Sequence, residues 1–367
     1  MENSSYLKEQ LITYLGNKRS LLNFINNVVL VVKEELGKER IVTFDGFSGS
    51  GCVARYLKQH STLIITNDLE KYSFIINDSF LKNKSEVDFD RINEYVVLLN
   101  EKKHRTDLGV GIIERLYSPK DTKNPQPGER CFYTNENAKI IDNIRRTIEL
   151  EIPDEYKNTF ISILLHEASV HANTSGVFKG FYKGLKSDRG KFGGEKENAL
   201  ERILGEINIK SIILSNFDSE RRLYQRNTND LVKELDVDID LTYYDPPYNQ
   251  HPYGSNYHVL NTIVDYVEPQ ELSDVAGIPK NWNKSDYNKK AAACKSFDDL
   301  IQNTKSKYIM ISYNSEGFIS YDEMMEICNK KGETRVYDEL YNVFRGSRNL
   351  KDRDNKVTEF IFLIKSN

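Results

Sequence analysis

Apolar and polar residues alternate along the chain with two different periods. Apolar positions between residues 17 and 36 recur at helical spacing, which predicts an amphipathic helix. The short apolar runs at 40–44 and 62–68 are typical of buried strands, and a helical stretch at 52–59 lies between them. Strand, turn, helix and strand in this order predict a βαβ unit and therefore a parallel sheet. A further helix is expected over 70–81.

The pattern changes after about residue 86, where polar, helical stretches replace the strand-like runs. Strand-like runs return in the C-terminal part, at 210–214, 221–226, 237–244, 306–314 and 357–365, with a helix near 316–331. The simplest organisation is one α/β domain, made of residues 1–85 and 206–367, with a largely helical insertion at 86–205.

Composition narrows the class of protein without identifying a function. Hydrophobic residues make up 39% of the chain and charged residues 29%, as in soluble globular proteins. No run is long enough to span a membrane, and the start MENSSYLKEQ lacks the features of a signal peptide. The 4 cysteines stand far apart without a CxxC pair, which favours reduced thiols, no zinc site and a cytoplasmic protein. The net charge of -4 does not indicate a nucleic-acid partner, although clustering of basic residues matters more than the total.

The turn between the first two strands, FDGFSGSG at 44–51, is rich in glycine. Glycines let the backbone approach a ligand closely, and the following helix offers free N–H groups. Asp68 ends the second strand roughly twenty residues on, where an acidic residue usually binds a ribose diol. This pairing fits NAD and S-adenosylmethionine alike, but the third spaced glycine of the dinucleotide fingerprint is absent, which disfavours NAD. A P-loop is excluded because no GK[ST] follows, and a purely structural turn is the remaining alternative.

The strand expected at 237–244 runs into YYDPPY, in which Asp245 precedes two prolines and Tyr248. Proline fixes φ and donates no backbone hydrogen bond, so this segment predicts a rigid, acceptor-rich turn between a carboxylate and an aromatic ring. A plain strand-ending turn is the alternative, and the glycine-rich turn upstream makes it the weaker one.

Three segments in this order, YLGNKRSLL (14–22), FDGFSGSG and YYDPPY, resemble the adenine-specific DNA methyltransferases of the D12 class, in the α arrangement of motifs. The resemblance extends over most of the chain and is looser at LYQRNTNDL (223–231), at MISYNSEG (310–317) and near the C-terminus. It implies a Rossmann-like, S-adenosylmethionine-dependent methyltransferase sheet with an inserted, mostly helical target-recognition domain.

The resemblance also implies a set of cofactor contacts. Lys18 would offer its charge to the methionine carboxylate or to a nearby phosphate, with a solvated lysine as the alternative. Asp68 would hold the ribose hydroxyls, and Asp230 would touch the adenine ring or only cap the next helix. The full set of cofactor-binding residues is Tyr14, Lys18, Asp45, Phe47, Ser48, Gly49, Gly51, Asp68, Asp230 and Asp245.

The chemistry of adenine agrees with this assignment. The exocyclic N6 is a poor nucleophile because its lone pair is delocalised into the ring. The Asp245 carboxylate and the Pro246 carbonyl could accept hydrogen bonds from its two N–H groups. These hydrogen bonds would localise the lone pair and aim it at a methyl donor. Tyr248 would stack on a base rotated out of the duplex. Such an in-line transfer needs neither a metal nor a strong general base, and the implied catalytic residues are Asp245, Pro246, Pro247 and Tyr248.

The expected partner is double-stranded DNA, bound by a monomer, with any cognate restriction endonuclease acting separately. A basic loop with interspersed aromatic residues, at 176–194, could follow the phosphates and reach a groove, although such a loop is often merely solvated. His258 begins a helical stripe and suits packing as well as DNA contact. The implied DNA-binding residues are Lys179, Lys183, Lys186, Arg189, Lys191, Tyr253, Tyr257, Arg345 and Arg348.

Three other functions compete with a DNA methyltransferase of a restriction-modification system. The protein could methylate RNA adenine or a protein glutamine, but glutamine modifiers typically carry asparagine at the position of Asp245 and lack a large helical insertion. An NAD-dependent oxidoreductase would leave the DPPY segment unexplained. An inactive DNA-binding protein of the same fold would not need the intact DPPY residues.

Overall fold

The computed structural model describes residues 2–184, 189–194, 197–342 and 356–367. Within these residues seven strands form one sheet, in the order β3-β2-β1-β4-β5-β7-β6. β7 runs antiparallel to both of its neighbours, whereas the strands from β3 to β5 pair in parallel. This sheet confirms the expected α/β, Rossmann-like fold. The strands are β1 (Ile41–Asp45), β2 (Ser61–Asp68), β3 (Glu220–Gln225), β4 (Ile239–Tyr244), β5 (Ser306–Asn314), β6 (Gly332–Asn342) and β7 (Lys356–Ser366).

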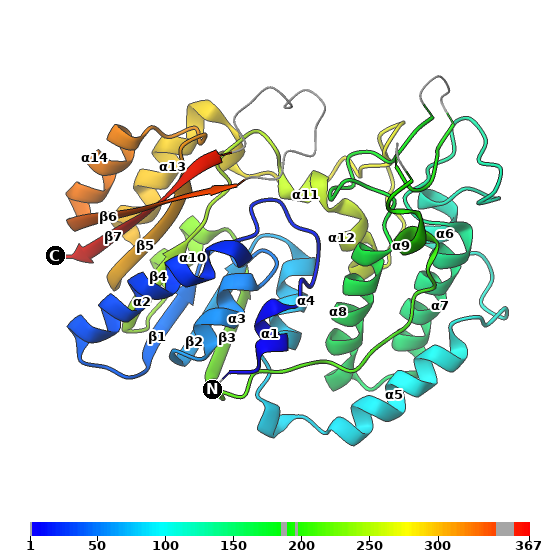
Figure 1. Ribbon diagram of the computed structural model, residues 1–367, viewed down its shortest axis with the longest axis horizontal. Coiled ribbons are helices and arrows are strands. Elements are labelled where there is room, and N and C mark those ends of the chain that lie inside the picture. Colours follow the sequence, from blue (N-terminus) through cyan, green and yellow to red (C-terminus); the bar gives the residue numbers. More distant parts are fainter. Residues whose placement is uncertain (1, 185–188, 195–196, 343–355) are drawn as a thin grey trace.

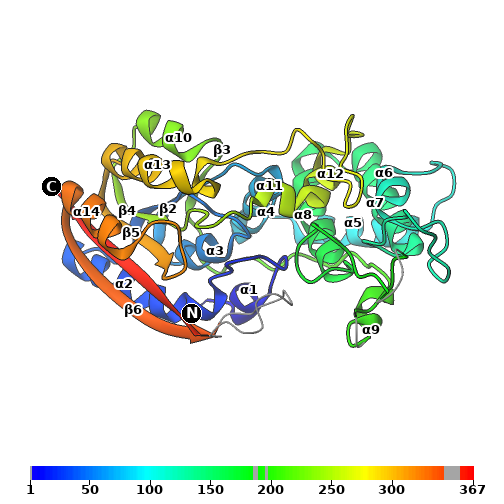
Figure 2. The ribbon, with the colours of Figure 1, turned by 90° about the horizontal axis from the view of Figure 1, so that it is seen from above.

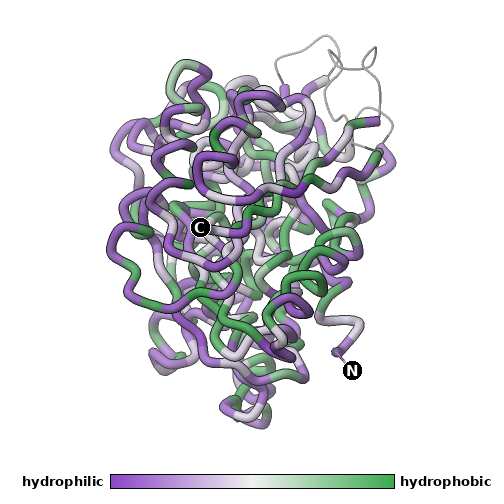
Figure 3. Tube along the Cα trace, turned by 90° about the vertical axis from the view of Figure 1, so that its left-hand side faces the viewer, coloured by the Kyte–Doolittle hydropathy of each residue, from purple (hydrophilic) through white to green (hydrophobic). Residues whose placement is uncertain are grey.

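Helices cover both faces of the sheet (Figures 1 and 2). One face packs against α2 (Leu22–Leu36) and α3 (Cys52–Lys58), whose apolar side chains form a core with β1, β4 and β5. The other face is covered by α10 (Thr228–Glu234), α13 (Lys290–Asn303) and α14 (Tyr321–Lys331). α2 keeps the expected apolar stripe and ends before Gly37, but it begins at Leu22 and not at residue 17. In Figure 3 the apolar segments run mainly through the interior, and polar segments make up most of the outer turns.

A helical lobe lies beside the sheet, on the side of β3 (Figure 1). Its core contains apolar residues of the expected insertion and also residues from α4, from 207–214 and from 257–276. No helix among the described residues is long and apolar enough to cross a membrane. The helices of this lobe and its border are α1 (Ser4–Lys8), α4 (Lys71–Phe80), α5 (Phe89–Lys102), α6 (Ile112–Tyr117), α7 (Asn135–Glu151), α8 (Asp154–Val170), α9 (Leu200–Leu204), α11 (Tyr253–Asn256) and α12 (His258–Asp265).

Three expectations about local structure need correction. The run at 210–214 is not a strand, because Ile212 and Leu214 are buried in the core of the helical lobe and not beside another strand. The sequence pattern does not predict β6, whose residues mix charged and apolar types as an edge strand allows. The helix expected from 316 begins only at Tyr321, where Ser320 and Glu323 form a capping box.

β1 and β4 lie side by side in the middle of the sheet, with Asp45 paired in register with Tyr243. From β1 the chain continues to β2 on one side, and from β4 to β5 on the other. Open α/β sheets bind ligands at the carboxyl ends of their strands, where the strand order reverses in this way. The glycine-rich turn follows β1 and the DPPY turn follows β4, so the fold brings the two motifs to the same place.

Candidate active site

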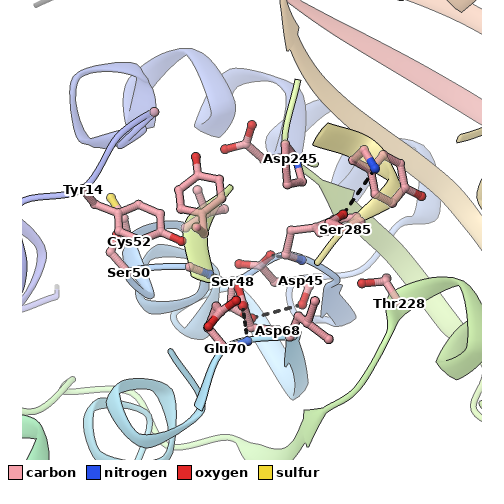
Figure 4. A pocket seen from close by; sticks show the side chains of 18 of the residues that line it. Tyr14, Asp45, Ser48, Ser50, Cys52, Asp68, Glu70, Thr228, Asp245 and Ser285 are labelled. Atoms are coloured by element: carbon pink, nitrogen blue, oxygen red, sulfur yellow. Dashed lines mark hydrogen bonds between the residues drawn. The ribbon is translucent and has the colours of Figure 1, made fainter. Parts of the chain in front are cut away.

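A cavity of about 880 Å³, measured out to its open mouth, lies at the carboxyl ends of β1, β2 and β4. Figure 4 shows side chains from these separate segments gathered around one space. The cavity therefore unites the three motifs that stand far apart in the sequence. Of the expected site residues, those that line it are Tyr14, Lys18, Asp45, Phe47, Ser48, Gly49, Asp68, Asp245, Pro247 and Tyr253.

The glycine-rich turn is fastened to the end of β2. The Ser48 hydroxyl donates a hydrogen bond to the Asn67 carbonyl over 2.8 Å, and the Gly49 N–H donates one to Oδ2 of Asp68 over 2.7 Å. Gly49 has a φ of +50°, and a Cβ there would lie 2.7 Å from the ring of Tyr14. Gly51 also has a positive φ, but it begins α3 beside Asn77 and does not line the cavity.

Asp45 is a buried acceptor at the base of the turn. Only 1% of the residue is exposed, and Oδ1 receives a long hydrogen bond of 3.4 Å from the Phe47 N–H. Among the described residues Oδ2 has no hydrogen-bond partner. Burial raises the pKa of the Asp45 carboxyl well above its usual value. An unpartnered buried oxygen that borders a cavity is suited to a ligand that donates a hydrogen bond.

Two carboxylates stand at the end of β2. Asp68 accepts hydrogen bonds from the backbone N–H groups of Gly49 and Glu70. Glu70 also lines the cavity, although the sequence pattern gives no sign of it. Asn261 donates a hydrogen bond to Oε2 of Glu70 over 2.6 Å, and burial together with the charge of Asp68 raises the pKa of Glu70 to about 7.

The segment that carries Tyr14 is held by two tyrosines of the helical lobe. The Tyr14 ring stacks on Tyr253 and on Tyr257, with centroid distances of 4.9 Å in both cases. The Tyr257 hydroxyl accepts a hydrogen bond of 2.8 Å from the Leu15 N–H, and the Tyr253 hydroxyl donates one of 3.0 Å to the Leu15 carbonyl. Tyr257 is 0% exposed, so the expectation that it contacts DNA is wrong for this structure. Its position is that of a support for the cavity wall.

Lys18 is buried and paired within the protein, which rules out the alternative of a solvated lysine. Its Nζ lies 3.0 Å from Oδ1 of Asp245 and 3.1 Å from Oε1 of Glu359, and the residue is only 3% exposed. Burial alone would lower the pKa of Lys18, but the two carboxylates raise it well above the usual value, so the ammonium stays charged. Burial raises the pKa of Asp245 to about 6, Lys18 opposes this shift and Glu359 adds to it.

The rest of the DPPY turn is anchored on the side of β5. The Tyr248 carbonyl accepts a hydrogen bond of 3.0 Å from the Phe318 N–H, and its ring meets Tyr313 edge-on at 6.0 Å. Asn288 donates to the carbonyl of Asn249 over 2.8 Å. Pro246 is buried and Tyr248 is partly exposed, and neither of them lines the cavity itself. The turn is therefore held in place from two sides.

The expected DNA-binding loop has charges outside and aromatic rings inside. Phe178 and Phe192 are buried, whereas Lys179, Lys183 and Arg189 are exposed. Lys191 pairs with Glu197 over 2.9 Å, and Lys186, Arg345 and Arg348 lie outside the described residues.

Two further expectations do not fit the cavity. Asp230 is exposed on α10 and does not line the cavity, so the cofactor contact expected from it is wrong for this structure. His258 is buried, with ring nitrogens 3.0 Å and 3.2 Å from the carbonyls of Ser255 and Ala276, and it packs instead of facing DNA. The lining residues that sequence reasoning missed include Glu70, Asn227, Thr228, Asn283, Ser285, Tyr287 and Asn288.

These missed residues come from two segments. Asn227 and Thr228 stand three and two residues before Asp230, so the motif there identifies the right turn but the wrong side chain. The segment 283–288 forms another wall, in which Tyr287 meets Phe47 edge-on at 5.4 Å and donates a hydrogen bond of 2.7 Å to Asn229. No periodic pattern marks this segment in the sequence.

The fold and the site thus define an α/β protein with a cavity beside a DPPY turn, at the sheet edge where proteins of this class bind their ligands. A family profile described as "D12 class N6 adenine-specific DNA methyltransferase" matches residues 14–327. The chain belongs to this family and is a DNA methyltransferase, as its motifs imply.

Individual relatives agree with the family. The type II methyltransferase M.NlaIII of Neisseria lactamica is 28% identical, and the match covers 96% of this chain and 99% of that protein. The type II methyltransferase M.CviAII of Paramecium bursaria Chlorella virus 1 is 28% identical, covering 96% of this chain and 98% of that protein. The type II methyltransferase M.FokI of Planomicrobium okeanokoites is 27% identical, covering 96% of this chain but only 52% of that protein.

Proposed function

We propose that the protein transfers a methyl group from S-adenosylmethionine to the exocyclic N6 of adenine in double-stranded DNA. The observation that carries this proposal is that Asp245, at the start of the DPPY turn, lines the same cavity as the glycine-rich turn after β1. One cavity therefore combines a nucleoside-binding wall with a carboxylate that can accept a hydrogen bond from an amine. The description of the family as N6 adenine-specific supports the choice of base.

The residues of the cavity fit S-adenosylmethionine. The unpartnered oxygen of Asp45 suits the ammonium of the methionine part. The bare Cα of Gly49 keeps open the space between the turn and Tyr14. Asp68 and Glu70 offer acceptors for the ribose hydroxyls at the end of β2. When bound, the cofactor would supply an activated methyl group.

The protein's own contribution is to orient the target amine and to take up its proton. Lys18 lies 3.0 Å from Oδ1 of Asp245, which leaves Oδ2 as the acceptor for the target amine in this proposal. That oxygen and the Pro246 carbonyl would accept hydrogen bonds from the two N–H groups of the adenine amine, and the prolines keep both acceptors in place. As the new N–C bond forms, the amine loses one proton, and Asp245 would accept it with a pKa of about 6. Tyr248 would stack on the extruded base.

We propose that the helical insertion at 86–205 recognises the target sequence and that the basic loop within it follows the DNA phosphates. Exposed Lys179, Lys183 and Arg189 support this role, because a cation must be accessible to contact a phosphate. The names of the type II relatives support a place in a restriction-modification system. In that setting we propose a cytoplasmic monomer, with any cognate endonuclease acting separately.

One experiment tests activity, base and sequence together. The purified protein is incubated with unmethylated plasmid DNA and labelled S-adenosylmethionine, and the product is read by modification-sensitive sequencing. We expect N6-methyladenine at a defined sequence. Asp245→Asn should reduce methylation by about 100-fold or more, because it removes the charged acceptor and the proton acceptor, with little change in cofactor affinity.

Asp230→Asn is the matched control, because it makes the same chemical change at an exposed position of α10 that does not line the cavity. We expect it to methylate as the unaltered protein does. Methylation of cytosine, or full activity in Asp245→Asn, would contradict the proposed function. Loss of activity in Asp230→Asn would instead show that this exposed position of α10 contributes to the reaction.

A further inference from the structure

Glu359 is a fully buried carboxylate beside the active site. It lies near the start of β7, on the face that packs against α2, where the neighbouring positions Val357, Ile361 and Leu363 are buried and apolar. Because β7 runs antiparallel, its beginning lies beside the carboxyl ends of β4 and β5, and Glu359 pairs in register with Asn314 at the end of β5. A charge in an apolar stripe is costly unless it is paired, so its presence needs an explanation.

The contacts of Glu359 lead directly to Asp245. Oε1 of Glu359 lies 3.1 Å from Nζ of Lys18 and accepts a hydrogen bond from the Ser312 hydroxyl. The same ammonium lies 3.0 Å from Oδ1 of Asp245. One buried cation therefore bridges two carboxylates, and one of these belongs to the DPPY turn. Oε2 of Glu359 is buried and has no hydrogen-bond partner among the described residues.

A lysine by itself is a poor means of fixing a carboxylate. Its ammonium is carried on a flexible four-carbon stem, and holding that stem in one rotamer costs conformational entropy. Lys18 also lines the cavity, where a cofactor carboxylate could attract it away from Asp245. A second buried carboxylate removes this freedom, because the ammonium then has two fixed partners on the protein.

We propose that Glu359 is a positioning residue for methyl transfer: with Ser312 it fixes Lys18 against Oδ1 of Asp245, so that Oδ2 stays available to the target amine. This inference rests on the proposed function and assigns to β7 a part in the same site. It also accounts for the pairing of Lys18 with two carboxylates at once.

Glu359 influences the charge of the site as well as its geometry. Its negative charge raises the pKa of Asp245, against the opposing effect of Lys18. Replacement by glutamine removes that charge and leaves the amide oxygen to accept from Lys18, so the pKa of Asp245 should fall below about 6. The other titratable groups that face this cluster are Asp45, Tyr243, Tyr248, Tyr341 and, opposite Glu359 on β6, Glu339.

Single-turnover methylation as a function of pH separates the two effects. In Glu359→Ala, we expect the plateau rate to fall about tenfold or more, as for a misplaced catalytic group, with the dissociation constant for S-adenosylmethionine changed by less than about threefold. In Glu359→Gln, we expect a smaller loss of rate, and we expect the acidic limb of the plot of rate against pH to shift to lower pH. Ser312→Ala should lower the rate without shifting that limb. Glu339→Gln, which removes an exposed carboxylate on the same rung of the sheet, should change neither quantity.

A second measurement needs no catalysis. The free protein is labelled with ¹³C at aspartate carboxyls, and the signal absent from Asp245→Asn is followed as a function of pH in the other variants. We expect a midpoint near pH 6 in the unaltered protein, a lower one in Glu359→Gln and an unchanged one in Glu339→Gln. If Glu359→Ala does not fold, Glu359→Gln and Ser312→Ala provide the test.

The possible failures can be told apart. If the unaltered protein methylates no adenine, the proposed function is wrong, and the titration still decides whether Glu359 acts on Asp245. If the protein is active but Glu359→Gln changes neither the pH limb nor the Asp245 midpoint, the positioning role is wrong. A parallel loss of rate and cofactor affinity in Glu359→Ala would also overturn it, because Lys18 would then serve the cofactor and not Asp245.

Discussion

Gly49 shows how one residue controls access to the cavity. A methyl group at this position would lie 2.7 Å from the Tyr14 ring, and the φ of +50° is strained for any other residue. We expect Gly49→Ala to weaken S-adenosylmethionine binding about tenfold or more, because either Tyr14 or the turn must move, at a cost of about 1 kcal/mol or more. Calorimetric titration with the cofactor measures this. Gly37→Ala is the matched control, since its φ is +62° with nothing within 4 Å of the added carbon, and it should bind normally.

Single residues of the site could be predicted where a motif fixes them through the backbone. The glycine-rich turn with Gly49 and the carboxylate of Asp68 follow from the strand-turn-helix pattern, and Asp45 follows from the family resemblance. All three residues line the cavity. Asp230 fails because α10 turns it to solvent while Thr228, two residues earlier, faces the cavity. The direction of Lys18 also could not be predicted, because its partner Glu359 stands more than three hundred residues away in the chain.

Segment 13–15 is held by elements that are distant in the sequence. Ser169 of α8 accepts a hydrogen bond from the Thr13 N–H, and Leu15 is held by Tyr253 of α11 and by Tyr257, which stands between α11 and α12. Tyr257→Phe leaves the Leu15 N–H without its acceptor in a partly buried site, a loss of about 1–3 kcal/mol. We expect the displaced Tyr14 to weaken cofactor binding by roughly tenfold or more. Tyr253→Phe removes only a bond to an exposed carbonyl that water can replace, and it should cost much less. Equal effects in the two variants, measured by the same titration, would show that stacking and not hydrogen bonding holds this segment.

The sequence predicts those helices and strands in which buried positions follow a regular pattern of apolar residues. β1, β2, β4 and β5 are buried strands with continuous or alternating apolar residues, and the sequence pattern predicts all of them. β6 has mixed residues because only β7 pairs with it, and 210–214 is apolar because it covers helices in an extended form. A local pattern reports that a segment is buried, but it does not report what covers it.

At the scale of the whole molecule, the cavity joins the two parts of the chain. β1, β2 and β4 supply its base, while Tyr253 and Gly254 come from α11, which lies between the sheet and the helical lobe (Figure 1). In the proposed function, DNA that reaches Asp245 would lie against both parts. The basic loop begins beside α11, where the Phe178 N–H donates a hydrogen bond of 2.7 Å to the Asn256 carbonyl, so it is placed to hold the duplex next to the cavity.

Binding of DNA by this loop predicts a change in salt dependence. Lys179 and Arg189 are exposed, and each phosphate contact contributes about 0.9 to the slope of log affinity against log salt concentration. We expect the double variant Lys179→Gln and Arg189→Gln to weaken binding of duplex DNA and to reduce that slope by up to about two, measured by fluorescence anisotropy across a salt series. Lys84→Gln with Arg91→Gln removes two exposed cations near the start of α5, at the opposite edge of the helical lobe in Figure 1, and should leave the slope unchanged. An equal reduction in both double variants would mean that the loop contributes only net charge, and an unchanged slope in the first would remove it from the DNA interface.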